Sequence, residues 1–246
     1  MGADRLALLL SEAHFHDTPV HFEIATLQMS LPDLSSDRAR ALALTPVSRE
    51  TAARLDRFVA LLLKWQEITH LIAPSTVPTL WTRNIADSLQ LLDLAPDAEI
   101  WVDFGTGGGF PGLVIACALY GKSDRRVHLV EGSTKKAAFL REAVAATQAP
   151  AVVHAVRMEK FVETFAGRPD IVTARAVSPL SSLLGECLPL LKRGALGLFP
   201  KGQDVAAELT EASKCWNMTV DLVPSRTDPK ARIVMVRALE PRVTVP

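Results

Sequence analysis

From residue 99 onward, short apolar runs alternate with longer stretches in which apolar residues recur at helical spacing. The apolar runs occupy residues 100–104, 127–131, 151–156, 170–174 and 195–199. Helical patterns separate them, at residues 110–120, 134–147, 178–192 and 204–214. Strands rich in Val, Ile and Leu that alternate with helices predict a mostly parallel, twisted sheet with helices on both faces. We therefore expect an α/β fold over residues 99–246.

The last two apolar runs differ from the others in their spacing. Residues 218–223 and 232–238 are joined only by PSRTDPKA, which leaves no room for a crossover helix. Strands connected this closely pair in the antiparallel sense. We predict an antiparallel hairpin at the C-terminal end of the sheet.

Between residues 48 and 98 the apolar residues recur at helical spacing. Ser48 is suited to cap a helix because its hydroxyl can accept a hydrogen bond from a first-turn amide. The apolar residues that follow recur at helical spacing: Leu55, Phe58, Leu62 and Trp65. A second helix is expected at residues 79–92. Periodicity is weak over residues 1–47, of which 1–28 precede a second methionine, so we interpret 1–47 as an extension and 48–98 as an N-terminal helical segment.

Composition narrows the class of protein. The 246 residues are 48% hydrophobic and 22% charged, which is typical of a globular domain, and no apolar run approaches the roughly 18 residues of a membrane span. Three scattered cysteines form no disulfide framework, so we expect a cytoplasmic protein. The net charge of zero argues against a protein that coats nucleic acid. Residues 1–110 carry a net charge of −6 and residues 111–246 one of +6, a division that fits either solvated faces or a basic binding surface.

Five glycines crowd the stretch WVDFGTGGGFPG, residues 101–112, where the first strand turns into the next helix. Ligands of such sheets bind outside the carboxyl ends of the strands, and glycine lets a ligand approach the backbone closely. Gly105 and Gly107 fit the first two positions of the dinucleotide pattern G-x-G-x-x-G, but Phe110 occupies the third. The loop therefore departs from a dinucleotide site.

Two acids flank this loop. Asp103 stands immediately before it, where a carboxylate disfavours phosphate and suits a cationic amino or sulfonium group. Glu131 ends the second strand, where a carboxylate can accept hydrogen bonds from ribose hydroxyls, although a turn acid is the alternative. Together with Gly105, Gly107 and Gly109, these acids predict a site for S-adenosylmethionine (SAM), which carries both cationic groups and no phosphate.

The sequence resembles the RsmG (GidB) family over residues 48–239. The resemblance rests on VSRETAARLDRFVALLLKW, APSTV, RNIADS, WVDFGTGGGFPGLVIA, KKAAFLREA, RMEKF, ARAVSPL and FPKGQ. It implies a Rossmann-like class I SAM-dependent methyltransferase that methylates N7 of a guanine in 16S ribosomal RNA, within the small ribosomal subunit or an assembly intermediate. Two positions depart from the family pattern: Asn84 stands where the family has His, and His70 where it has Asn.

The resemblance also assigns roles to individual residues of the cofactor site. It implies that Gly105 and Phe110 contact the cofactor, and that Met158 and Glu159 hold its adenine. It places Arg175, at the end of the fourth strand, beside the cofactor and near the methyl group, as a positioning residue. A solvated arginine at a strand end is the structural alternative for Arg175.

A basic rim is implied as well. The resemblance assigns Lys135, Arg157 and Lys201 to RNA binding, and it counts Lys135 and Lys201 with Arg175 among the catalytic candidates. Lys135 opens a helix, where a cation is disfavoured by the helix dipole, so a purely stabilising role fits it poorly. Lys201 has a turn lysine as its alternative.

The implied chemistry needs neither a general base nor a metal. Guanine N7 has a free lone pair and loses no proton on attack, so methyl transfer depends on alignment of the two reactants. The six histidines show no ligand spacing beyond His14 and His16, and we expect no metal site. Two other functions stay open: a nicotinamide-dependent oxidoreductase, which Phe110 and Asp103 disfavour, and a non-catalytic RNA-binding module.

Overall fold

A seven-stranded sheet forms the centre of the part of the chain that the computed structural model describes, residues 32–122 and 124–242. Its strands are β1 (Ile100–Phe104), β2 (Arg126–Val130), β3 (Ala151–His154), β4 (Ile171–Ala174), β5 (Leu196–Lys201), β6 (Trp216–Pro224) and β7 (Arg232–Pro241). Their order is β3-β2-β1-β4-β5-β7-β6. The strands β1 to β5 are parallel, and β7 pairs antiparallel with both β5 and β6. The predicted mostly parallel sheet with a C-terminal hairpin is confirmed.

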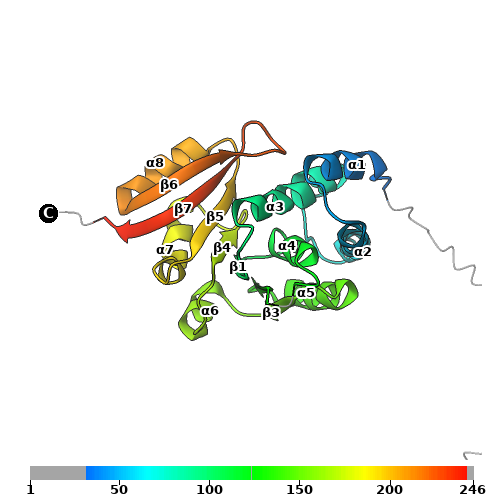
Figure 1. Ribbon diagram of the computed structural model, residues 1–246, viewed down its shortest axis with the longest axis horizontal. Coiled ribbons are helices and arrows are strands. Elements are labelled where there is room, and N and C mark those ends of the chain that lie inside the picture. The colour runs from blue at the N-terminus through cyan, green and yellow to red at the C-terminus, as the bar shows by residue number, and fades with distance from the viewer. Residues whose placement is uncertain (1–31, 123, 243–246) are drawn as a thin grey trace, which may run out of the picture. The chain divides into compact units, whose positions relative to one another are not determined.

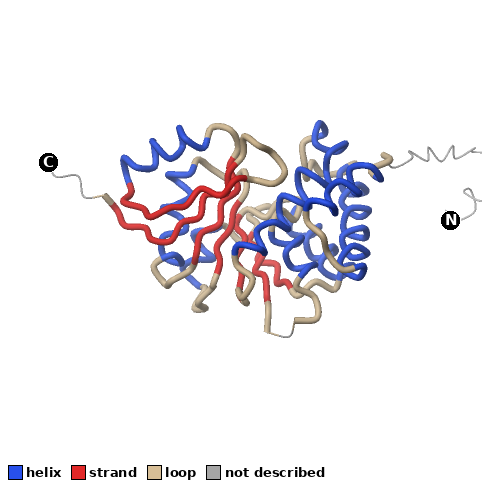
Figure 2. Tube along the Cα trace, turned by 45° about the horizontal axis from the view of Figure 1, so that its top comes forward, coloured by secondary structure: helices blue, strands red, loops and turns tan. Residues whose placement is uncertain are grey.

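Helices cover both faces of this sheet (Figures 1 and 2). They are α4 (Gly112–Ala118) and α5 (Thr134–Thr147) on one face, and α6 (Met158–Thr164), α7 (Leu180–Leu191) and α8 (Val205–Cys215) on the other. Alternate residues of a strand point to opposite faces, so each strand feeds both cores. Trp101 joins the core beneath α4 and α5, whereas its neighbour Val102 joins the core beneath α6 and α7. The loops that follow the parallel strands gather at the carboxyl edge of the sheet.

The N-terminal helical segment packs partly on α4 and α5 and partly beside α4 (Figure 1). It consists of α1 (Ser35–Leu44), α2 (Arg49–Gln66), η1 (Pro74–Thr79), η2 (Trp81–Ala86), α3 (Asp87–Leu89) and η3 (Gln90–Leu94). Ser48 caps α2 as predicted, because its hydroxyl accepts a hydrogen bond from the Thr51 N–H at 3.2 Å. The Phe58 ring of α2 is fully buried and lies 5.4 Å from the Phe110 ring and 6.3 Å from the Phe139 ring. This aromatic packing joins the segment to the same core as the sheet.

Two helices were not predicted from the sequence. Helix α1 lies within the segment interpreted as an extension, and the compact unit that contains the sheet begins at Pro32. The buried Asp37 holds α1 in place by accepting a hydrogen bond from the Trp81 N–H at 2.8 Å. Helix α6 has only seven residues. Residues 1–28 lie outside the described residues.

The stretch expected as one helix at residues 79–92 is irregular. A π-helical turn, η2, is followed by one turn of α-helix and then by the 3-10 turn η3. Pro78 precedes it within η1, and Ala95 ends it in a non-helical conformation. The wider π turn carries the RNIADS motif to the carboxyl edge of the sheet, where Arg83 and Asp87 line a pocket.

Candidate cofactor and acceptor site

The glycine loop follows β1 in a conformation that requires glycine. Gly105, Gly107 and Gly109 have φ angles of +61°, +55° and +95°, in the left-handed region where side chains are strained. The Gly105 N–H donates to the Val130 carbonyl of β2 at 2.9 Å, which fixes the start of the loop to the sheet. The three glycines predicted as cofactor contacts therefore form one rigid turn at the carboxyl edge.

The atoms around each glycine show whether protein or open space lies next to its Cα. A Cβ at Gly109 would lie 2.8 Å from the Phe58 ring, and one at Gly112 would lie 2.5 Å from Leu129. These two positions are bare because protein packs against them. A Cβ at Gly107 would meet, among the described residues, only the Gly105 carbonyl oxygen, at 3.6 Å. Gly107 is thus the loop glycine that faces open space.

Asp103 lies fully buried behind this loop. Its Oδ2 accepts a hydrogen bond from the Gly112 N–H at 2.9 Å, while its Oδ1 has no hydrogen-bond partner in the described part of the chain. Burial raises the pKa of Asp103 to about 7, against the opposing effects of hydrogen bonds that involve Thr106 and Gly112. A buried carboxyl group with an unsatisfied oxygen is compatible with a cationic ligand group, and that contact stays a prediction.

Glu131 lies beside the loop at the end of β2. Its Oε2 accepts a hydrogen bond from the Gly107 N–H at 2.9 Å, and its Oε1 accepts one from the Ser133 N–H at 2.7 Å. Glu131 therefore connects the glycine loop to the start of α5. Each carboxylate oxygen keeps a second lone pair that is available to accept a hydrogen bond from a ribose hydroxyl. That hydrogen bond stays a prediction.

The structure gives less support to three other predicted cofactor contacts, which are Phe110, Met158 and Glu159. The Phe110 side chain is buried against Phe58 in the core, at 6% exposure, so it presents little surface to a ligand. Met158 is half-buried at the start of α6, and Glu159 beside it is exposed. Both follow β3, next to β2 in the sheet. Their contact with an adenine is untested and stays a prediction.

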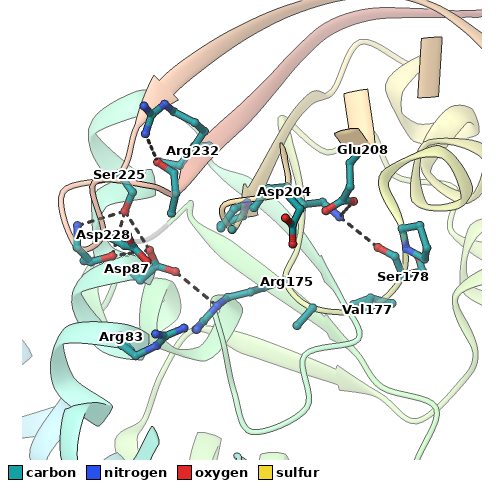
Figure 3. Close-up of a pocket in the computed structure, with 18 residues that line it drawn as sticks. Arg83, Asp87, Arg175, Val177, Ser178, Asp204, Glu208, Ser225, Asp228 and Arg232 are labelled. Carbon is teal, nitrogen blue, oxygen red and sulfur yellow. Dashed lines mark hydrogen bonds and ion pairs between the residues drawn. The ribbon is translucent and has the colours of Figure 1, made fainter. Parts of the chain in front are cut away.

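A pocket of about 670 Å³ is lined by Arg175 and Val177, which follow β4 (Figure 3). It lies at the carboxyl ends of β4 and β5 and is walled by η2 and by the connection between β6 and β7. Val177 lines it and also covers the loop, since a Cβ at Gly105 would lie 2.5 Å from Val177 Cγ2. The pocket therefore opens beside the first glycine, on the β4 side of the sheet.

Arg175 enters this pocket from the end of β4, as predicted. Its Nε lies 3.4 Å from Asp87 Oδ2, and its Nη1 is buried without a hydrogen-bond partner among the described residues. Burial lowers the pKa of Arg175, and the Asp87 carboxylate opposes that effect. A guanidinium with an unused donor fits a ligand atom in the pocket better than the solvated arginine that was the alternative.

Asp87 lines the same pocket, and its pattern in the sequence did not mark it as a site residue. Its Oδ1 accepts hydrogen bonds from Gln90 Nε2 at 2.8 Å and from Thr227 Oγ1 at 2.9 Å. One carboxylate thus connects the RNIADS motif, the pocket arginine and the β6–β7 connection. Its signal was its place in the RNIADS motif, within a helical stretch whose other charged residue is Arg83. In the same motif, Asn84 is buried and its Oδ1 has no partner among the described residues, whereas His70 is exposed.

The predicted basic rim is not a single surface. Lys135 in the first turn of α5 and Arg157 before α6 are exposed at the carboxyl edge. Lys201 is different: its side chain is only 9% exposed, and its Nζ donates to Glu208 Oε2 at 2.7 Å and to the Ser178 carbonyl at 3.2 Å. The expectation of an exposed Lys201 is therefore corrected, since its charge is neutralised inside the pocket wall.

Neither a metal cluster nor a membrane-spanning helix is found in the parts of the chain described here. Residues 32–122 and 124–242 contain no group of three or more His, Cys, Asp or Glu side chains that could hold a metal ion. No helix within these ranges is long and apolar enough to cross a membrane.

The chain is similar in sequence to ribosomal RNA methyltransferases and in fold to a solved methyltransferase. A ribosomal RNA small subunit methyltransferase G from Bradyrhizobium sp. (strain BTAi1) is 59% identical over 207 residues, 84% of this chain and 93% of the relative. One from Rhodopseudomonas palustris (strain BisB18) is 57% identical over 211 residues, 86% and 90% of the two chains. The solved O-methyltransferase from Bacillus cereus in complex with SAH has a TM-score of 0.54 at 13% identity, over 83% of this chain and 98% of that one.

The structural likeness supports the fold alone and confirms the expected Rossmann-like methyltransferase architecture. The sequence profile of a family described as rRNA small subunit methyltransferase G matches residues 51–234. With the extent of that match and the identity to the relatives, the chain belongs to the rRNA small subunit methyltransferase G (GidB) family.

Proposed function

We propose that this protein is a SAM-dependent methyltransferase that methylates N7 of a guanine in 16S ribosomal RNA, in the cytoplasm. The observation that carries the proposal is the pairing of two adjacent features. One is the glycine loop, with open space at Gly107 and an unsatisfied Asp103 oxygen behind it. The other is the pocket into which Arg175 projects. The names of the relatives, which are ribosomal RNA methyltransferases, support the substrate class.

The loop residues would hold the cofactor. When bound, SAM supplies a methyl group on a positively charged sulfur. Asp103 would balance that cation or the amino group, and the open space at Gly107 would permit close approach to the backbone. Glu131 offers lone pairs for the ribose hydroxyls from the end of β2.

The acceptor side needs orientation rather than proton transfer. Guanine N7 attacks through its lone pair, so the pocket requires no general base. The transfer leaves positive charge on the purine, which disfavours a cation directly against the ring. Arg175 therefore fits hydrogen bonding to O6, where its Nη1 donor would be satisfied. Asp87 holds the guanidinium from the other side at 3.4 Å.

Cofactor affinity is expected to rise with pH through about 7. Because burial raises the pKa of Asp103 to about 7, the carboxyl group is protonated below that pH and cannot pair with a cation. Calorimetry with SAM on either side of this pH should show weaker binding on the acid side, and Asp103→Asn should abolish the difference. Affinity that is independent of pH in the unmodified protein would contradict this role for Asp103.

The same pKa has a consequence for stability. The folded-state pKa of Asp103 lies above that of a free aspartate, so its stabilising contribution is present at low pH and is lost as the pH rises toward 7. The cofactor-free Asp103→Asn variant should therefore show a melting temperature that falls less over this interval than that of the unmodified protein.

Lys135→Ala is expected to weaken RNA binding and to reduce its salt dependence by about one ion. The Lys135 side chain is exposed at the first turn of α5, so its charge is available to a phosphate. Binding to 16S RNA, measured at several salt concentrations, checks this. Lys201→Ala is the contrast, because that ammonium is already paired with Glu208 and its loss should leave the salt slope unchanged.

Two assays separate the proposed function from its competitors. Thermal shift with SAM and with NAD distinguishes a methyltransferase from a nicotinamide-dependent oxidoreductase. Transfer of a labelled methyl group to small-subunit RNA distinguishes an enzyme from a non-catalytic RNA-binding module. The proposal expects stabilisation by SAM and label in the RNA; stabilisation by NAD alone, or no label, would refute it.

A further inference from the structure

Four charged groups of the pocket form ion pairs, whereas the carboxylate of Asp204 forms none with the residues that the structure describes. Arg175 lies 3.4 Å from Asp87, and Lys201 lies 2.7 Å from Glu208, so these four charges balance in two pairs. Asp204 also lines the pocket, yet its carboxylate makes no ion pair or hydrogen bond within residues 32–122 and 124–242. It projects toward the middle of the pocket, across from Asp87 and Arg83 (Figure 3).

The Asp204 carboxylate is not used to build the fold. It stands immediately before α8, at a position where an aspartate often caps a helix, but its side chain accepts no hydrogen bond from the first turn. Ser48 and Ser133, at the equivalent positions of α2 and α5, do cap their helices. The Asp204 oxygens are therefore free for a ligand in the pocket.

A second unused polar group lies on the same side of the pocket. Ser178 Oγ is buried and has no partner among the described residues, although the Ser178 carbonyl accepts a hydrogen bond from Lys201. Buried hydroxyls in folded proteins are normally hydrogen-bonded, so this one indicates a missing partner. Ser178 and Asp204 thus offer acceptors on the side of the pocket next to β5, whereas the guanidinium groups of Arg83 and Arg175 lie on the side next to η2 and Asp87 (Figure 3).

We propose that Asp204 determines base specificity, by accepting hydrogen bonds from N1–H and the 2-amino group of the acceptor guanine. This inference rests on the proposed function. Guanine presents acceptors, O6 and N7, along one edge and donors, N1–H and the 2-amino group, along another. That polarity matches a pocket with guanidinium groups on one wall and a free carboxylate on the other.

Adenine has the reverse polarity at the positions that matter. Its amino group replaces O6 and would face Arg175, and its N1 is an acceptor that would face Asp204. Each mismatch leaves a charged group without its hydrogen bond, which costs more than the loss of a neutral contact. Asp204 therefore selects guanine by rejecting adenine as well as by binding guanine.

Inosine tests this inference because it keeps N7, O6 and N1–H and lacks only the 2-amino group. Small subunits are reconstituted with guanosine or inosine at the methylated position, and kcat/KM is measured for both. The unmodified protein should prefer guanosine by a factor of about 10 to 100. In Asp204→Ala, kcat/KM for guanosine should fall by a similar factor, and the preference should shrink toward unity.

Asp204→Asn and Asp228→Ala serve as comparison variants. Asp204→Asn keeps the size of the side chain and removes the charge, so it should retain part of the preference. Asp228 also lines the pocket, but its carboxylate already accepts a hydrogen bond from the Lys230 N–H at 2.9 Å, so its loss should leave the preference intact. SAM affinity and melting temperature should not change in either Asp204 variant.

The outcomes separate the inference from the function on which it rests. A full guanosine preference in Asp204→Ala, or equal methylation of guanosine and inosine by the unmodified protein, would overturn the role of Asp204 alone. Failure of the unmodified protein to methylate guanosine at all would overturn the proposed function.

Discussion

Arg175→Ala is expected to lower methyl-transfer turnover about 100-fold or more, with little change in SAM affinity. The side chain projects into the pocket beside the glycine loop, and its Nη1 donor has no partner in the described part of the chain. If that donor orients the acceptor base, its loss allows the reacting nitrogen to move away from the cofactor, and a displacement of about 1 Å can cost about 10²-fold in rate. Single-turnover methylation and calorimetry with SAM measure the two quantities separately.

A control is needed because Arg175→Ala also strands a carboxylate. Asp87 would lose its guanidinium partner, which threatens the β6–β7 connection that Asp87 holds through Thr227. The double variant Asp87→Asn/Arg175→Ala removes that unpaired charge and should recover melting temperature without recovering turnover. Arg226→Ala, which breaks the exposed pair with Asp93, should alter neither. Recovery of turnover in the double variant would show that Arg175 acts only through structure.

Gly107→Ala is expected to raise the dissociation constant for SAM at least about tenfold, because an added methyl group occupies the space that a ligand would use. The position has open space above it, so the Cβ meets no protein atom closer than 3.6 Å among the described residues. The fold should therefore tolerate the substitution, apart from the strain of a non-glycine residue at a φ of +55°. Calorimetry and thermal melting check the two effects.

Gly121→Ala provides the matched control for that strain. Gly121 has a φ of +79° and lies in the turn after α4 rather than in the glycine loop. A Cβ added there would meet no atom of the described residues within 4 Å. Both variants should lose similar stability, and only Gly107→Ala should lose SAM affinity. Equal SAM affinity in the two variants would place the cofactor elsewhere.

The strands of the sheet could be predicted because each is a short run of buried apolar residues bounded by turns. The run at residues 100–104 coincides with β1, and the other parallel strands agree within about two residues, as expected for pattern-based boundaries. The glycine loop could also be predicted, because positions with a positive φ, such as Gly105 and Gly107, favour glycine. The carboxylates Asp103 and Glu131 were predicted from their positions near strand ends, and their contact with a cofactor stays a prediction.

What the sequence did not reveal depends on contacts between distant residues. Asp87 and Thr227 are 140 positions apart, and their hydrogen bond leaves no local pattern. Lys201 was expected on an exposed rim because a lysine after a strand is usually solvated, but Glu208 on the next helix neutralises it. Helix α1 has weak amphipathic character, so its formation depends on Asp37 and the backbone of η2 rather than on its own sequence.

The most direct test of the central claim is the mapping of 7-methylguanine in 16S ribosomal RNA from cells with and without this protein. The account predicts a single guanine whose N7 methylation disappears with the gene, returns with the unmodified protein and does not return with Gly107→Ala. The returned methyl group should come from labelled SAM when the purified protein is added to unmethylated small subunits. An unchanged 7-methylguanine pattern in the absence of the protein, or restoration by Gly107→Ala as complete as by the unmodified protein, would contradict the account.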